Sequence, residues 1–355
     1  MNRTSISFCA LARIVAIWGS GVSLGFAQGA PSIVWEAPTP SGLANSIVGV
    51  GWAPGPAGQV AMGSTDRWLR TRQAASGALG YSILGPQHSR GGDQTNYSTD
   101  GLYLAVHNLN KGLDYRVYRA TDGFFLGTIV VTMDSNGIIQ FTPDAQLQAV
   151  VPNAMSRFRI EEFTVVISVG SGYQITTTTF NFSPKGAYQS AVGSGQISIQ
   201  SRTDGSTIAQ FPGGAVRGAT AVSFTPNSSA IAAWDPDSNR TTLWRIADQQ
   251  VLMQFPDAVP EEGVAAIRFT PDGTHLVTSG YFAFQVDGGP WQQYGVIRLW
   301  RVADGTLRKQ YDQHTGIAVT SAIAWSPGAT QFIYGTYEGT VVAARSPLLK
   351  GISPR

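Results

Sequence analysis

The chain has 355 residues, of which 43% are hydrophobic and 13% are charged, and its formal net charge is +2. This composition allows a substantial core, and near-neutral charge without a basic block argues against nucleic-acid binding. The 41 glycines and 19 prolines predict frequent turns, which favour many short strands over long helices.

Residues 1–27 are expected to form a signal peptide. A short polar start with Arg3 precedes an apolar run, and Gly25-Phe26-Ala27 places small residues where a signal peptidase cuts. Arg13 interrupts the run, so it offers no clean transmembrane span. An N-terminal membrane anchor and an unprocessed tail are the alternatives. The predicted mature chain, residues 28–355, is a single domain without a transmembrane span that is secreted or periplasmic.

The predicted mature chain contains no cysteine, because Cys9 is the only one in the sequence. Disulfides, thiol catalysis and cysteine-ligated zinc are therefore not expected. Removal of Arg3 and Arg13 with the signal peptide also leaves 22 basic and 22 acidic residues, so the mature chain is neutral.

An internal repeat dominates the rest of the sequence. An aromatic residue followed by Ser, Thr or Ala, and usually by Pro, recurs in seven copies, and only the step to the last copy is clearly longer than the others. The regular spacing matches the four-stranded blade of a β-propeller, which takes about 40–45 residues. The repeated aromatics are Trp52, Tyr97, Phe141, Phe182, Phe224, Phe269 and Trp325.

Each copy has a readable strand pattern. An alternating strand such as Ala265–Phe269 places its aromatic on a buried face, Pro271 ends that strand, and Asp272-Gly273 makes a turn into the strand 275–278. A second turn lies farther along, between two more apolar runs, and predicts a hairpin. Its copies are Thr121-Asp122-Gly123, Thr203-Asp204-Gly205, Ala247-Asp248-Gln249 and Ala303-Asp304-Gly305.

Two of these stretches resemble the WD40 repeat, namely Phe269-Thr270-Pro271-Asp272-Gly273 and Ile297-Arg298-Leu299-Trp300-Arg301. The resemblance covers roughly residues 32–346. It implies an all-β, seven-bladed β-propeller of four-stranded antiparallel blades, in a diverged and bacterial form.

The chain departs from the WD40 pattern in three places. The terminal Trp-Asp pair of the family is Trp-Arg at 244–245 and 300–301, and the Gly-His dipeptide is missing, with Gln313-His314 as its nearest relative. The third copy, between Asp144 and Thr179, lacks a clear hairpin signal. The polar network that the resemblance implies is therefore incomplete in every identifiable blade.

The two ends of the repeat region are complementary. The last copy stops after a third strand at 339–345, whereas a spare strand, Ile33-Val34-Trp35-Glu36, precedes the first copy. Pairing the spare strand onto the last blade would remove a sheet edge. We therefore expect the N-terminal strand to close the ring.

The sixth copy contains the longest insertion, because its aromatic, Phe269, lies farther from its hairpin Asp, Asp304, than in the second and fifth copies. The excess, residues 281–295, falls between the second and third strands, and Asp287-Gly288-Gly289 suggests a hairpin tip. By resemblance to WD40 propellers, this loop lies on the face most used for binding. The insertion is a candidate binding site, and the alternative is that its rings pack on the neighbouring blade. Its five aromatics are Tyr281, Phe282, Phe284, Trp291 and Tyr294.

Metal and catalytic motifs are weak. Residues 235–239 alternate oxygen ligands like the start of a calcium loop, but Arg240 stands where Gly is needed and Ile246 where a carboxylate is needed, so a turn explains them better. The four histidines fall in different copies. Gly63-Ser64 and Gly193-Ser194 lack a nucleophile frame. We expect no catalytic residue, no metal and no cofactor.

The sequence therefore favours a non-catalytic, WD40-like interaction module outside the cytoplasm, with a protein or a glycan as partner. The alternative is a propeller enzyme, lactonase-like or quinoprotein-like, with its site at the mouth of a central channel. Such a site needs acids and histidines that converge from several blades. A purely structural role in an envelope assembly is a third possibility.

Overall fold

The computed structural model describes eighteen stretches of the chain. Within them it contains strands β1–β28 and no helix, so the described protein is all-β. The stretches are residues 31–39, 46–55, 58–84, 95–108, 113–132, 138–141, 147–151, 154–158, 163–168, 179–193, 196–212, 222–235, 238, 240–256, 263–285, 291–313, 319–336 and 338–348.

The strands form one sheet for each copy of the repeat, and we number the sheets in chain order. The first three differ in size. The first sheet has four antiparallel strands, β2 (Ile47–Trp52), β3 (Gln59–Ser64), β4 (Trp68–Gln73) and β5 (Leu79–Leu84). The second has five, β6 (Thr95–Tyr97), β7 (Tyr103–Asn108), β8 (Leu113–Arg119), β9 (Phe125–Thr132) and β13 (Phe163–Ser168). The third has β10 (Ile138–Phe141), β11 (Leu147–Val151) and β12 (Ala154–Phe158).

The remaining sheets each have four antiparallel strands. The fourth consists of β14 (Thr179–Phe182), β15 (Tyr188–Gly193), β16 (Gln196–Ser201) and β17 (Thr207–Pro212). The fifth consists of β18 (Val222–Phe224), β19 (Ala230–Asp235), β20 (Arg240–Arg245) and β21 (Val251–Pro256). The sixth consists of β22 (Gly263–Phe269), β23 (His275–Gln285), β24 (Trp291–Arg301) and β25 (Leu307–Gln313). The seventh consists of β26 (Val319–Trp325), β27 (Gln331–Thr336), β28 (Thr340–Arg345) and β1 (Ile33–Pro38).

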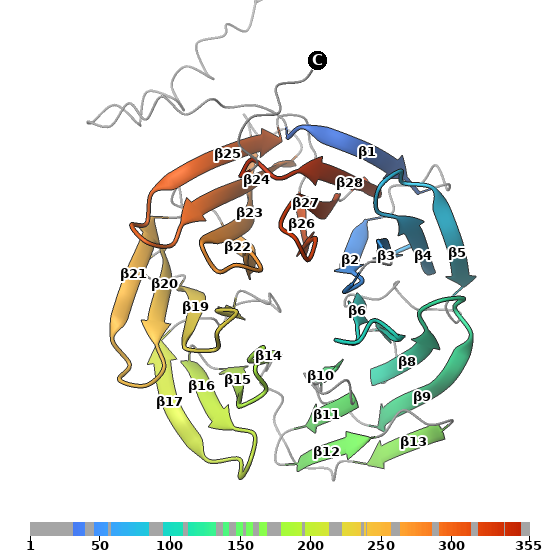
Figure 1. Cartoon of the computed structure of the whole chain (residues 1–355), viewed down its shortest axis with the longest axis horizontal. Coiled ribbons are helices and arrows are strands. Elements are labelled where there is room, and N and C mark those ends of the chain that lie inside the picture. Colours follow the sequence, from blue (N-terminus) through green and yellow to red (C-terminus); the bar gives the residue numbers. More distant parts are fainter. Residues whose placement is uncertain are drawn as a thin grey trace, which may run out of the picture.

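The sheets follow one another around a common centre, as Figure 1 shows, with the first strand of each sheet nearest that centre. This arrangement is compatible with a propeller-like fold. The seventh sheet combines both ends of the chain, because β1 pairs with β28 in antiparallel register from Ile33↔Ala344 to Pro38↔Thr340. This is the strand pairing expected from the sequence.

The third copy is where the regular pattern fails. Its sheet has three strands, and the segment that would supply the fourth, β13, instead pairs with β9 of the second sheet in parallel, from Phe163↔Gly127 to Ser168↔Thr132. The absence of a hairpin signal between Asp144 and Thr179 agrees with this difference, because the sequence there carries no motif that favours a tight turn between β12 and β13.

Hydrophobic side chains fill the spaces between consecutive sheets. Between the fourth and fifth sheets, Phe211 stacks on Trp244 with ring centroids 5.3 Å apart. Similar clusters join the fifth sheet to the sixth, the sixth to the seventh, and the seventh to the first. Two of the repeated aromatics, Phe224 and Phe269, are buried as the alternation predicts, whereas Trp52, Tyr97 and Trp325 are half-buried.

In five sheets, a buried hydroxyl holds the turn that follows the repeated aromatic. In the sixth sheet, the Thr270 Oγ1 accepts a hydrogen bond from the His275 backbone N–H at 3.1 Å and donates one to Asp272 at 2.6 Å. The bond from the backbone N–H recurs with lengths of 2.9–3.0 Å in the other four. This bond explains why Ser or Thr follows the aromatic. The equivalent hydroxyls belong to Ser98, Ser183, Thr225 and Ser326.

The second turn explains why arginine follows tryptophan at 244–245 and 300–301. In the fifth sheet, the Arg245 side chain pairs with Asp248 at 2.8 Å, across the hairpin that joins β20 to β21. The same pair joins Arg119 to Asp122 and Arg301 to Asp304. The arginine that ends the third strand is therefore bound to the hairpin aspartate three residues later. These pairs are solvent-exposed, so they specify turn geometry more than stability.

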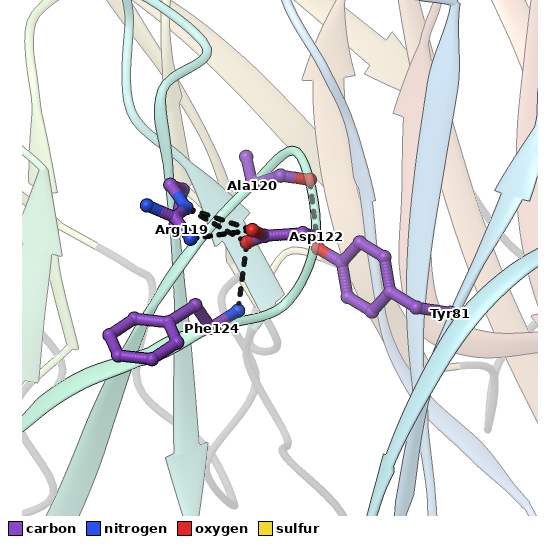
Figure 2. Close-up of polar contacts among 5 residues, drawn as sticks. All are labelled: Tyr81, Arg119, Ala120, Asp122 and Phe124. Carbon is purple, nitrogen blue, oxygen red and sulfur yellow. Dashed lines mark hydrogen bonds and ion pairs between the residues drawn. The ribbon is translucent and has the colours of Figure 1, made fainter.

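The outermost strand of one sheet packs against the second turn of the next. In Figure 2, Tyr81 of β5 reaches the β8–β9 turn, where its hydroxyl donates to the Ala120 carbonyl at 3.0 Å. Gly123 lies so close that a Cβ there would be 2.7 Å from the Tyr81 ring. Burial, together with the Asp122 charge, raises the pKa of Tyr81 to about 12. The hydroxyl therefore stays a donor at all physiological pH values.

β1 takes the place of an outermost strand in the same kind of contact. The buried Trp35 donates from Nε1 to the Ala74 carbonyl at 2.7 Å, at the β4–β5 turn of the first sheet. A Cβ on Gly77 would meet the Trp35 ring at 2.8 Å. Trp35 therefore makes the same kind of contact with the second turn of the first sheet that Tyr81 makes with the second turn of the second sheet.

Replacing Tyr81 with phenylalanine is expected to lower the free energy of unfolding by about 1 kcal/mol, because the Ala120 carbonyl loses its donor while the ring contact with Gly123 remains. Urea unfolding followed by circular dichroism measures this. Ser82→Ala, an exposed change on the same strand, serves as the control and is expected to leave stability unchanged. Equal stability of Tyr81→Phe and the wild type would contradict the assigned bond.

Candidate functional site

The described residues of the predicted binding insertion, 281–285 and 291–295, are regular β-structure. β23 and β24 are the longest strands in the described part of the chain, and they pair continuously from His275↔Arg301 to Gln285↔Trp291. The second and third strands of the other sheets are much shorter. The insertion therefore lengthens a hairpin of the sixth sheet. The predicted tip, Asp287-Gly288-Gly289, lies outside the described residues.

The register divides the five candidate aromatics between two faces of this long hairpin. Phe282 pairs with Tyr294, and Phe284 pairs with Gln292 two positions along, so positions 282, 284 and 294 fall on one face of the strand pair. Positions 281 and 291 fall on the other face. The sequence alone could not divide the five in this way, because the division depends on which residues pair across the hairpin.

A second candidate lies on the strands nearest the centre, at the position just before each repeated aromatic. In the described side chains this position carries only small or polar residues apart from Arg268, and all but the first are half-buried. The neighbours of Arg268 on β22, Ile267 and Phe269, are buried in the core. These two face the fifth sheet, so alternation puts Arg268 on the opposite face, with Ala266 and Val277, toward the seventh sheet. The other described residues at this position are Gly51, Asn96, Ser223 and Ala324.

Arg268 is a half-buried arginine without a counter-charge within ion-pair distance among the described residues. Its Nη1 donates to the Ile267 carbonyl at 2.8 Å, and this is its one assigned hydrogen bond. Burial lowers the pKa of the guanidinium from its ordinary value. Sequence reasoning passed over Arg268, since an arginine in an alternating strand carries no motif.

A buried ion pair fixes the turn between β3 and β4. Arg70 Nη2 lies 2.6 Å from Asp66 Oδ2, with side chains 8% and 7% exposed. The Ser64 hydroxyl donates to Asp66 and accepts from Arg70, and the Trp68 backbone N–H also donates to Asp66. Burial alone would raise the pKa of Asp66, but the bonds from Arg70, Ser64 and Trp68 outweigh it and lower the pKa. Ser64 therefore belongs to a structural network.

The other residues that the sequence singled out, the histidines and the 235–239 segment, do not come together in one site among the described residues. His275 contacts the Thr274 hydroxyl through Nδ1 at 2.8 Å, and burial and nearby arginines lower its pKa against the opposing Asp272. Ser238 donates to Asp235 at 2.6 Å, while Pro236, Asp237 and Asn239 lie outside the described residues. Within the described part of the chain, no three His, Cys, Asp or Glu side chains are grouped closely enough to hold a metal.

Comparisons with known proteins add no family to this description. Neither the known protein families nor the curated protein sequences give a match to the chain. In the stretches that the structure describes, no helix has the length and apolar character needed to cross a membrane.

Proposed function

We propose that the chain is a seven-bladed, WD40-like β-propeller, closed by β1 and exported by a signal peptide at positions 1–27, that acts as a non-catalytic interaction module. The seven repeats, the order of strands within the sheets and the pairing of β1 with β28 support the architecture. The partner is a protein or a glycan outside the cytoplasm.

The extended hairpin β23–β24 is the observation that carries the binding role. In a propeller, all turns between second and third strands open onto one face, so a hairpin lengthened by several residue pairs projects from that face. A projecting hairpin with five aromatics offers large contact area at low conformational cost. The hairpin is therefore the proposed contact with the partner.

The test uses one variant for each face of the hairpin, Phe282→Ala/Phe284→Ala/Tyr294→Ala and Tyr281→Ala/Trp291→Ala. Each purified full chain is applied to a glycan array and used for quantitative affinity capture from the envelope and secreted fractions of the source cells. We expect at least one variant to weaken binding by about 10-fold or more, since buried aromatic anchors dominate interfaces, while its melting temperature stays near that of the wild type.

A matched control is Phe124→Ala/Phe125→Ala. These aromatics are 53% and 47% exposed and belong to the β8–β9 turn and strand β9, away from the long hairpin. The control is expected to keep full binding. Equal binding by all three variants would rule out the hairpin as the contact, and a collapse of the melting curve in the hairpin variants would show that their rings support the fold instead.

A further inference from the structure

We propose that β13 exchanges between two sheets. In this structure it pairs in parallel with β9, from Phe163↔Gly127 to Ser168↔Thr132. In the second state it pairs in antiparallel with β12 and supplies the fourth strand that the third sheet lacks. Each state leaves a different sheet edge open, so the exchange controls which edge can take a strand from another chain. The inference uses the proposed propeller architecture but neither the long hairpin nor its partner, so its test is independent of that contact.

The place of β13 in the chain is that of a fourth strand. In five other sheets, five residues separate the third strand from the fourth, as 120–124 separate β8 from β9. Four residues, 159–162, separate β12 from β13. The ten residues between β13 and β14, 169–178, equal in number those between β5 and β6, 85–94. The connections on both sides are therefore long enough for β13 to complete the third sheet.

The direction of β13 suits both places. The second and third sheets alternate in direction from β6 to β9 and from β10 to β12, so a fourth strand runs opposite to the third strand of its own sheet. In a radial arrangement of similar sheets, the fourth strands of neighbouring sheets run the same way. A strand parallel to β9 is therefore antiparallel to β12. Since β13 lies at the rim between the second and third sheets in Figure 1, the exchange needs a sideways shift but no reversal.

Backbone pairing favours the place next to β12. Among the described strands, β12 is paired on one side only, with β11, so its other edge presents unpaired N–H and C=O groups. The pairing of β13 with β9 is parallel, and parallel pairs are slightly less stable per residue than antiparallel ones.

The connection between β12 and β13 favours the place next to β9. Residues 159–162, Arg-Ile-Glu-Glu, contain no glycine. Each five-residue connection instead has its last residue but one at positive φ, a region that is costly for residues with a side chain. The cost of the turn therefore opposes the gain from antiparallel pairing, which is the condition for an exchange between two states. The positive-φ residues are Gly77, Gly123, Gly205, Gln249 and Gly305.

Engineered disulfides report the two states, because Cys9 is the only native cysteine and can be replaced by alanine. Val165→Cys is common to both traps. Ile129→Cys adds its partner on β9, and Ser156→Cys adds the residue that faces it on β12 when 159–162 form the turn. Directly paired strand residues lie within disulfide range. Equilibration of the full chain in glutathione buffers, read by mass spectrometry, measures the effective concentration of each pair of thiols.

We expect both pairs to reach effective concentrations about 100-fold or more above that of Val165→Cys/Val251→Cys. Val251 is 54% exposed on the fifth sheet, so this control pair has no contact to report. A second set, Thr164→Cys with Thr128→Cys or with Arg157→Cys, repeats the test on the opposite face of β13.

The exchange requires both disulfides in at least one of the two sets. A β9 disulfide alone would show that β13 stays on the second sheet, and a β12 disulfide alone would show a regular four-stranded third sheet. Either result, or neither disulfide, would overturn the exchange and would leave the capture experiment on the long hairpin unaffected.

A change in the turn tests the cause of the balance. Glu161 is the last residue but one of its connection, the place of the positive-φ residues in the others. Glu161→Gly is expected to raise the effective concentration of the 156/165 pair, relative to the 129/165 pair, by about 5-fold or more. Glu161→Ala keeps a Cβ and is the matched control, with an unchanged ratio. An unchanged ratio in Glu161→Gly would overturn the role of the turn.

Discussion

Replacing Trp35 with alanine is expected to lower the free energy of unfolding by about 3–5 kcal/mol, the cost of truncating a buried aromatic. Trp35 is 8% exposed, and it links β1 to the first sheet through its bond to Ala74 and its contact with Gly77. The substitution leaves a cavity between the seventh and first sheets and an unpaired carbonyl at Ala74. Urea unfolding, followed by circular dichroism, measures the loss.

Two further variants separate the contribution of the Trp35 hydrogen bond from that of the buried ring. Trp35→Phe keeps most of the ring but not the donor, and we expect a loss of about 1–2 kcal/mol from the hydrogen bond and the smaller ring together. Glu36→Ala, an exposed change on the same strand, is expected to have no measurable effect. If Trp35→Ala unfolds at the same urea concentration as Glu36→Ala, then β1 contributes little to holding the seventh and first sheets together.

Replacing Asp66 with asparagine is expected to cost about 3 kcal/mol, because it leaves the Arg70 cation buried without its partner. This is the lower end of the range for breaking a buried pair, since the pair lies at a turn. Adding Arg70→Met in the same chain removes the unpaired charge and is expected to recover part of the loss. A double-mutant cycle on urea unfolding measures both steps, and an Asp66→Asn protein as stable as the wild type would contradict the role of the pair.

The same pair predicts a dependence of stability on pH. The pKa of Asp66 is lower in the folded protein than in the unfolded chain, so its contribution is fully present above the ordinary aspartate value near 4 and is lost as the pH falls through the folded value. The wild type is therefore expected to lose stability more steeply than Asp66→Asn below about pH 4. Asp248→Asn, at an exposed pair, is the control and is expected to follow the wild type.

Regular local chemistry made much of the fold predictable from sequence. The alternation before each aromatic, the Pro that ends a strand and the Asp-Gly turns all act within a few residues, and they placed most strands correctly. The spare strand at Ile33–Glu36 was recognisable because the last copy lacked a fourth strand. The seventh sheet contains that strand next to β28.

Features that depend on distant partners were not predictable. The parallel pairing of β13 with β9 joins segments that the whole third sheet separates in the chain, and it leaves no local signal. The Arg70–Asp66 pair has a spacing, Ser64-x-Asp66-x-x-x-Arg70, that becomes informative only when a turn and burial bring the three together. Arg268 became a candidate only when its place on the strand nearest the centre was known.

The pairing of β1 with β28 also constrains the order in which the sheets can form. Ile33 and Ala344 come from nearly opposite ends of the sequence, whereas nearly all other strand pairs join neighbouring segments. Local sheets can form as their own strands become available, but the seventh sheet needs the first and last strands together, and long-range closure of this kind is slow. During synthesis, the β1 segment must therefore wait without its partner until β28 is made. A nascent chain that stops before β28 is left with an unsatisfied strand edge, a common starting point for aggregation.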